Sequence, residues 1–105
     1  MIQTLDELLH SHREPVYLLF RRLKALDRQF LLWSDLEHEF AQFAETEVGA
    51  PLRDTAMPSI IRHAQEAVIN EPFICFAVRA RVGRWEYVQV NTEDMHSREL
   101  SVTEF

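Results

Sequence analysis

Five histidines and a single cysteine are the residues of this chain best suited to metal binding or nucleophilic chemistry. They are His10, His12, His38, His63, His96 and Cys75. His10 and His12 are two positions apart, so on a helix they point to different sides, whereas His10 and Glu14 are better spaced. A metal site needs three or four ligands, and two do not make one. We therefore expect ordinary surface or boundary histidines, with no metal and no cofactor.

Cys75 lies in the apolar segment FICF. A reactive thiol needs an exposed, electropositive setting, so we interpret Cys75 as a buried small hydrophobe. One cysteine cannot form an internal disulfide, which is typical of an intracellular chain.

Other signatures of catalysis are missing from the sequence. Gly49 and Gly83 are the only glycines, too few for a phosphate-binding loop. Acidic pairs such as Glu37 and Glu39 fall on predicted helices among solvated charges. The residues alone therefore offer no titratable cluster that would support an enzyme.

Three arginines and a tryptophan gather near a predicted hairpin tip: Arg79, Arg81, Arg84 and Trp85. One interpretation is a small patch that binds an anion or a protein partner. The other is a solvated strand end whose arginines lie over aromatic surface. An arginine cluster without a phosphate loop favours the second interpretation.

The bulk composition indicates one small globular domain spanning residues 1–105. Of the chain, 47% is hydrophobic, and 11 basic against 17 acidic residues give a net charge of −6. Nucleic-acid binders usually carry a basic patch, so we expect no nucleic-acid partner. The acidic, amphipathic start resembles no signal peptide, and no segment is apolar for the length of a membrane span, so we expect a cytoplasmic location.

The first half of the sequence predicts helices. Thr4 and Glu7 form a capping box, and apolar residues then recur every three or four positions from Leu5 to Phe30. Pro15 interrupts this pattern, and we expect a kink or a restart there.

A second helix is predicted from Ser34, with Glu37 completing its capping box and Gly49 ending it. Its apolar stripe is Leu36, Phe40, Phe43 and Val48.

A third helix is predicted from Thr55 or Pro58 to Ile69, ended by Asn70 and Pro72. Its inward residues would be Ile60, Ile61, Ala64 and Val68.

The aromatic residues Phe30, Trp33, Phe40 and Phe43 are predicted to be core or interface. If their density exceeds what one small domain can bury, the leftover apolar patch would need a neighbour.

The last third of the chain predicts antiparallel strands. The segment from Phe73 alternates apolar residues, Val82–Gly83 is the natural turn, and the return strand places Trp85 and Tyr87 on one face. The segment RELSV predicts a short third strand. The expected fold is α+β, with about three helices packed on a small antiparallel hairpin or meander.

The chain closes on another helix-start signal. Ser101 and Glu104 have capping-box spacing, and Leu100 and Phe105 occupy the positions of a hydrophobic staple. We expect the sequence to stop at the start of a truncated helix.

Both ends of the chain resemble the N-terminal region of sucrose synthases. The residues that match the pattern of that family are Leu5, Asp6, Glu7, Leu9, His12, Arg13, Gln65, Glu66, Ala67, Pro72, Ala77, Arg79, Trp85, Glu86, Tyr87, Asn91, Glu99, Leu100, Glu104 and Phe105. Ala80 and Arg81 replace a proline-containing approach to the hairpin turn. The phosphorylated serine of plant members would fall before Met1, so the chain resembles a bacterial-type member.

The resemblance implies a non-catalytic regulatory or targeting domain. The full-length enzyme would exchange glucose between sucrose and a nucleoside diphosphate, UDP or ADP, at a site outside this chain. The implied partners are the remaining domains of the parent enzyme and other subunits of a homo-oligomer. Plant members imply association with cytoskeleton or membrane, which the acidic charge and missing phosphosite argue against. The alternative is a stand-alone protein-interaction module.

Overall fold

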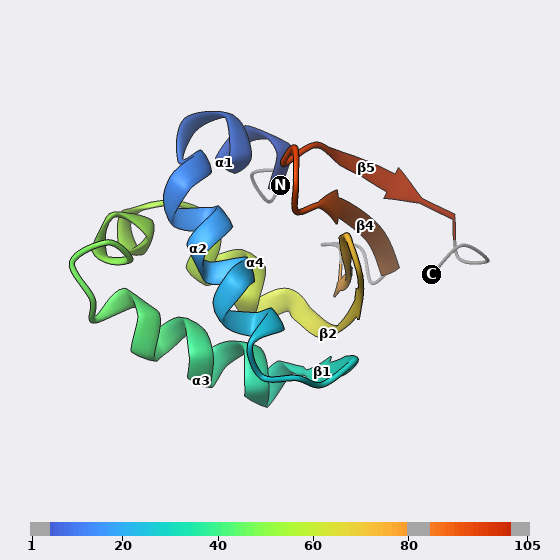
Figure 1. Cartoon of the computed structure of the whole chain (residues 1–105), viewed down its shortest axis with the longest axis horizontal. Helices are drawn as coiled ribbons and strands as arrows, with labels where there is room; N and C mark the ends of the chain where they lie inside the picture. Colours follow the sequence, from blue (N-terminus) through green and yellow to red (C-terminus); the bar gives the residue numbers. More distant parts are fainter. Residues whose placement is uncertain (1–4, 80–84, 102–105) are drawn as a thin grey trace.

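The computed structural model of the chain describes residues 5–79 and 85–101, which form a helical layer against an antiparallel sheet (Figure 1). The helices are α1 (Leu5–Ser11), α2 (Arg13–Lys24), α3 (Trp33–Ala44), the short 3-10 helix η1 (Ala50–Asp54) and α4 (Met57–His63). The strands are β1 (Phe30–Leu32), β2 (Ala64–Asn70), β3 (Phe73–Arg79), β4 (Trp85–Asn91) and β5 (Ser97–Leu100). The predicted α+β class is confirmed, with a larger sheet than a hairpin or three-stranded meander.

The first helical stretch breaks earlier than Pro15. His12 is the residue that separates α1 from α2, with φ −135° and ψ 45°. Pro15 then lies in the first turn of α2, where its missing N–H is not needed by the helix. The proline therefore starts a helix rather than kinking one. The Thr4 end of the predicted capping box lies outside the described residues.

Phe30 was predicted to continue the first helix, and this is wrong. Helix α2 ends at Lys24, and Asp27 adopts a positive φ of 55°, which turns the chain. Phe30 then begins β1, where Leu31 pairs with Ala67 of β2. Pairing to a distant strand overrides the helical spacing of the apolar residues.

Helix α3 begins one residue before Ser34, and its N-terminal hydrogen bond differs from the prediction. The Asp35 carboxylate accepts a hydrogen bond from the backbone N–H of Leu32, with a distance of 3.0 Å. Asp35, rather than Glu37, thus satisfies the free backbone donor before the helix. The predicted inward residues Leu36, Phe40 and Phe43 are buried.

Gly49 does not end α3, which stops at Ala44, and Val48 is exposed rather than part of the apolar stripe. The glycine has a packing role instead. A Cβ atom at position 49 would lie 2.1 Å from the backbone oxygen of Phe43, far inside any real contact. The Thr46 hydroxyl holds this close approach, because it donates to the Phe43 oxygen and accepts from the Gly49 N–H.

The third predicted helix is correct only in its first half. Helix α4 ends at His63, and Ala64–Asn70 forms β2. Ile60 and Ile61 are buried as predicted, but Ala64 and Val68 belong to the strand. β2 pairs with β1 on one side and β3 on the other, and this two-sided pairing outweighs its helix-like sequence.

The sheet has the order β1-β2-β3-β4-β5 with every neighbour antiparallel, so β1 and β5 are its edges. The predicted short strand in RELSV is confirmed as β5. The predicted Val82–Gly83 turn lies outside the described residues.

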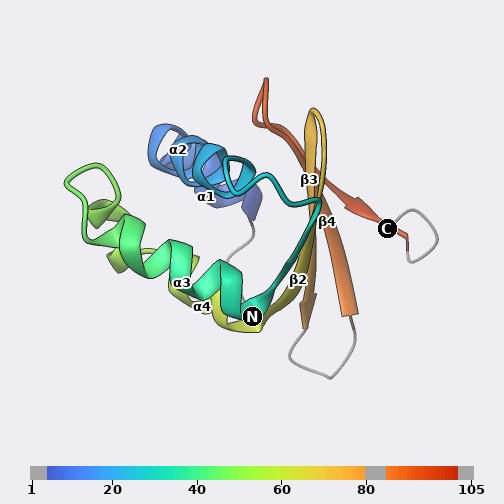
Figure 2. The ribbon, with the colours of Figure 1, turned by 60° about the horizontal axis from the view of Figure 1, so that its bottom comes forward.

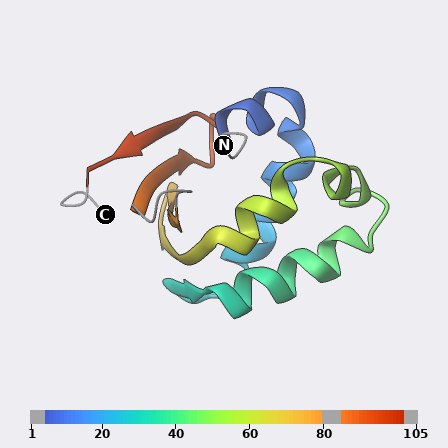
Figure 3. The same cartoon turned by 180° about the vertical axis from the view of Figure 1, so that it is seen from behind.

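The helices cover one face of the sheet, and the hydrophobic core lies between these two layers (Figure 2). Ile74, Phe76 and Val78 of β3 and Val90 of β4 lie on the inner face and are buried, and Val88 packs partly buried beside them. The ring of Phe76 lies 5.5 Å from that of Phe20 on α2, with a tilt of 40°. Viewed from behind, α3 and α4 complete the helical layer (Figure 3).

Candidate interaction surface

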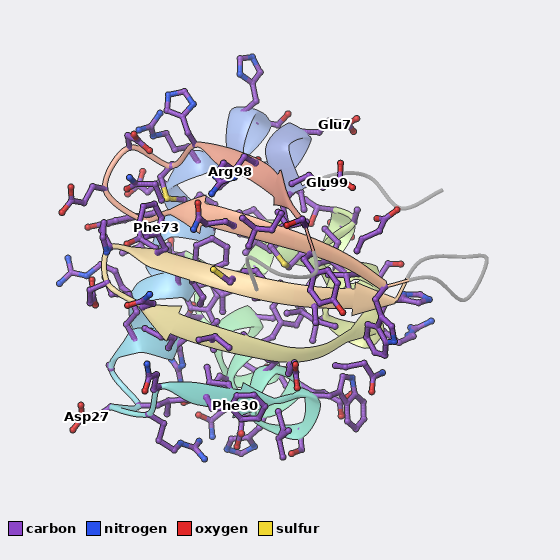
Figure 4. All side chains as sticks on the ribbon, turned by 90° about the vertical axis from the view of Figure 1, so that its right-hand side faces the viewer. Glu7, Asp27, Phe30, Phe73, Arg98 and Glu99 are labelled. Atoms are coloured by element: carbon purple, nitrogen blue, oxygen red, sulfur yellow. The ribbon has the colours of Figure 1, made fainter. Side chains whose placement is uncertain are left out.

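The opposite face of the sheet, called here the outer face, has no described helix or strand lying against it (Figures 2 and 4). Its side chains follow from the pairing register, because directly paired residues share a face. They are Phe30 and Leu32 on β1, Glu66, Val68 and Asn70 on β2, Phe73, Cys75 and Ala77 on β3, Trp85, Tyr87, Gln89 and Asn91 on β4, and Arg98 and Leu100 on β5. Figure 4 labels Phe30, Phe73 and Arg98 on this side.

A bulge places Glu66 on this face. The β2–β3 register shifts between Ala64, which pairs with Val78, and Glu66, which pairs with Ala77. The extra residue, Gln65, reverses the alternation, so Ala64 lies inward and Glu66 outward.

Three exposed apolar side chains lie together at the β1 edge, and Trp85 at the start of β4 is a further exposed apolar side chain of the outer face. Phe30, Leu32 and Trp33 have exposed fractions of 49%, 52% and 38%. Phe30 and Leu32 lie on β1, and Trp33 is the first residue of α3. Together these three residues are called the β1 patch. Cys75, Ala77 and Leu100, farther along the outer face, are buried. Large exposed apolar groups that lie together mark sites of interaction.

The predicted aromatic stripe is therefore divided between two environments. Phe40 and Phe43 lie in the core, whereas Phe30 and Trp33 are exposed. This pair is thus a leftover apolar surface outside the core, as an excess of aromatic residues would require.

Glu66 is half-buried. It lies beside the β1 patch because it pairs with Leu32. Sequence reasoning missed this residue, because AQEAVIN was assigned to a helix. The bulge hides the alternation that would have shown a strand, so periodicity carries no usable signal here.

Cys75 is buried in the middle of the outer face. Burial raises the pKa of its thiol, and the Gln89 side chain and the charge of Arg98 oppose that rise more weakly. A protonated, buried thiol is a poor nucleophile, in agreement with the interpretation of Cys75 as a small hydrophobe.

The arginine cluster falls largely outside the described structure. Arg79 pairs with Trp85 at the end of the β3–β4 hairpin, and Trp85 is 43% exposed. Arg81, Arg84 and the side chain of Arg79 are not among the described parts. The anion or partner patch stays a prediction.

The histidines lie on separate elements. His10, His38 and His96 are exposed, and His12 and His63 are half-buried. Within residues 5–79 and 85–101, no three His, Cys, Asp or Glu side chains gather where they could hold a metal ion.

A shallow polar groove lies between α2 and the turns of the sheet. Lys24 crosses it, with its Nζ 2.9 Å from a Glu71 carboxylate oxygen and 3.2 Å from the Thr92 hydroxyl. The guanidinium of Arg21 lies over the Tyr17 ring at 5.8 Å. The Lys24 contacts join α2 to the β2–β3 and β4–β5 turns, whereas the Arg21 contact lies within α2. We interpret the groove as a structural contact between these elements.

The fold thus defines a small α+β domain with one helix-covered and one outer sheet face. Comparison with known proteins identifies its family. The family model described as "Sucrose synthase N-terminal" matches residues 1–105, and the chain belongs to this family.

Individual relatives agree. The chain is 30% identical over 103 residues to sucrose synthase isoform 2 of Daucus carota and 32% identical over 103 residues to a sucrose synthase of Solanum tuberosum, each covering 98% of this chain and 13% of the relative. It is 34% identical over 107 residues to the sucrose synthase of Acidithiobacillus caldus, covering 96% of the chain and 13% of the relative. The chain therefore spans about 13% of the length of the relatives it matches.

In the described residues, no helix has the length and apolar character needed to cross a membrane.

Proposed function

We propose that this chain is the non-catalytic, regulatory or targeting N-terminal domain of a cytoplasmic sucrose synthase. The full-length enzyme would reversibly convert sucrose and UDP or ADP to the nucleoside diphosphate glucose and fructose. The observation that carries the proposal is a family match over residues 1–105 that covers only 13% of each relative. The reacting groups would then belong to the part of such an enzyme outside the 13% that this chain covers.

The domain would act through contacts with the rest of the enzyme or with other subunits. The β1 patch supports this role, because half-exposed aromatic and aliphatic side chains are stabilised when a partner removes them from water.

Three proteins test the proposal: the full-length gene product, a version that begins after residue 105, and the purified 105-residue chain. Each is assayed for cleavage of sucrose with UDP and with ADP. We expect the shortened enzyme to retain the chemistry while its assembly or regulation changes. The purified 105-residue chain should form no nucleoside diphosphate glucose, and formation of that product by this chain would overturn the proposal.

A stand-alone interaction module is the second candidate, and the exposed β1 patch is the observation that favours it. The mass of the native gene product separates the two. A product of 12.4 kDa would support the module, and one several times heavier would support the domain of a transferase.

A further inference from the structure

We infer that the β1 end of the outer face, formed by the β1 patch and Glu66, is the docking site for the polypeptide that follows residue 105 in the full-length protein. That segment would present apolar side chains to Phe30, Leu32 and Trp33 and a lysine or arginine to Glu66. The inference rests on the proposed function, because it requires that such a polypeptide exists.

Neighbouring residues of β1 differ sharply in exposure. Leu31 of β1 is fully buried against the helices, while its neighbours Phe30 and Leu32 are about half exposed on the outer face. Trp33 extends this exposed surface into the first turn of α3. An edge strand with exposed apolar side chains favours pairing or coverage, and this strand carries no charged residue to prevent it.

Glu66 differs from the other half-buried carboxylates of the described residues because it has no ion-pair partner there. Three carboxylates with described side chains are half-buried: Asp35, Glu39 and Glu66. Asp35 pairs with Arg28 at 3.1 Å, and Glu39 pairs with Arg22 at 3.4 Å.

Glu66 has no hydrogen-bond or ion-pair partner among the described residues. Its cross-strand neighbours on the outer face, Leu32 and Ala77, offer no side-chain donor. A partly desolvated carboxylate is costly without a partner, so a covering segment gains most by supplying a cation.

The chain geometry permits this occupant. β5 is the edge opposite β1, and Leu100 at its end lies on the outer face, paired with Tyr87. Four strand spacings separate the two edges, a distance of about 19 Å. An extended segment of about six residues, or a helix of about thirteen, spans that distance.

Size favours a covalently attached segment over a second copy of this domain. Stable interfaces between separate proteins usually involve about 20 to 30 residues on each side. The β1 patch with Glu66 supplies four. A tethered segment needs less contact area, because attachment gives it a high effective concentration.

A photo-crosslinker tests the occupant in the full-length protein. p-Benzoylphenylalanine replaces Trp33, and the matched control carries it in place of Val48, an exposed apolar residue between α3 and η1. We expect an adduct from position 33 that migrates as a single chain and maps beyond residue 105, with at least about fivefold lower yield from position 48.

Three outcomes would overturn the inference: an adduct at twice the chain mass, an adduct confined to residues 1–105, or equal yields at the two positions. Measuring the intact mass of the gene product first separates the two proposals. A product that ends at Phe105 removes the proposed function, whereas a longer product with no such adduct removes only the docking site.

Substitution of Glu66 tests the cationic contact in the same crosslinking assay. Glu66→Lys should lower the yield from position 33 about tenfold, because two cations would then face each other. Glu66→Gln should lower it by a smaller factor, and Glu37→Lys on the exposed side of α3 is the matched control. If Glu66→Lys reduces folding, Glu66→Gln decides. An unchanged yield in the folded variant would overturn the contact.

Discussion

The two faces of the sheet are built from the same five strands but differ in chemistry and in burial. The inner face is largely apolar and covered by helices, and the ring of Phe76 packs at a tilt against that of Phe20. The outer face mixes apolar side chains with Glu66, Gln89 and Arg98, and its β1 end is half exposed. Alternate residues of one strand therefore face the helical core and the exposed outer surface of the sheet.

This difference teaches where substitutions should act. Changes on the inner face should affect folding, while changes at the β1 patch should affect association with the rest of the protein. Four measurements address this division.

The largest effect is expected from truncating the inner face. Phe76→Ala removes a fully buried ring and should lower the free energy of unfolding by about 3–5 kcal/mol. Phe30→Ala on the outer face is the matched control and should cost less than about 1 kcal/mol, since its side chain is half exposed. Urea unfolding of the domain measures both. Equal losses would abolish the distinction between the faces.

A smaller effect is expected where the backbone packs closely at Gly49. Gly49→Ala places a methyl group against the Phe43 carbonyl oxygen and should destabilise the domain by about 1–3 kcal/mol. The neighbouring Val48→Ala alters an exposed side chain and should change stability by less than about 0.5 kcal/mol. Thermal unfolding compares the two variants. An unchanged stability of Gly49→Ala would show that the backbone held by the Thr46 hydroxyl, between Phe43 and Gly49, can move to accept the methyl group.

The smallest effect is expected at Asp35, a half-buried carboxylate that has an ion-pair partner, Arg28, whereas Glu66 has none among the described residues. Asp35→Ala removes the acceptor for the Leu32 N–H and should cost about 1 kcal/mol at pH 7. The Leu32 hydrogen bond, assisted by Arg28, lowers the pKa of Asp35 below its ordinary 3.8.

Because this pKa is lower in the folded state, the carboxylate stabilises the fold above about pH 3.8, and that stabilisation is lost as the pH falls through the lowered value. The stability difference between the parent and Asp35→Ala should therefore shrink in acid. A difference that does not change with pH would assign the loss to packing. Glu66→Ala should cost the isolated fold less than Asp35→Ala, since it breaks no described contact.

Much of the helical layer could be predicted from sequence, because its apolar residues follow helical spacing. Leu36, Phe40 and Phe43 are buried as that spacing requires. The hairpin from Phe73 to Asn91 was also predictable from its alternation.

The first two strands could not be predicted. β1 has only three residues, too short for a period, and β2 contains a bulge that disrupts alternation. β1 exists because it pairs with β2, and β2 because it pairs with both β1 and β3. This pairing is a long-range effect that local patterns do not contain. The exposed β1 patch and the isolated Glu66 depend on these strands, so the candidate surface was visible in sequence only as an excess of aromatic residues.

Side-chain oxidation of the full-length protein by hydroxyl radicals tests the central claim most directly. Phe30, Leu32 and Trp33 are compared with Val48 in the same molecule, so that the exposed valine serves as an internal standard. The claim that the outer face contacts the rest of the protein predicts strong protection of the three β1-patch residues while Val48 is oxidised. In the free domain these three side chains are 38–52% exposed. The claim would be contradicted if they are oxidised in the full-length protein at the rate expected for that exposure.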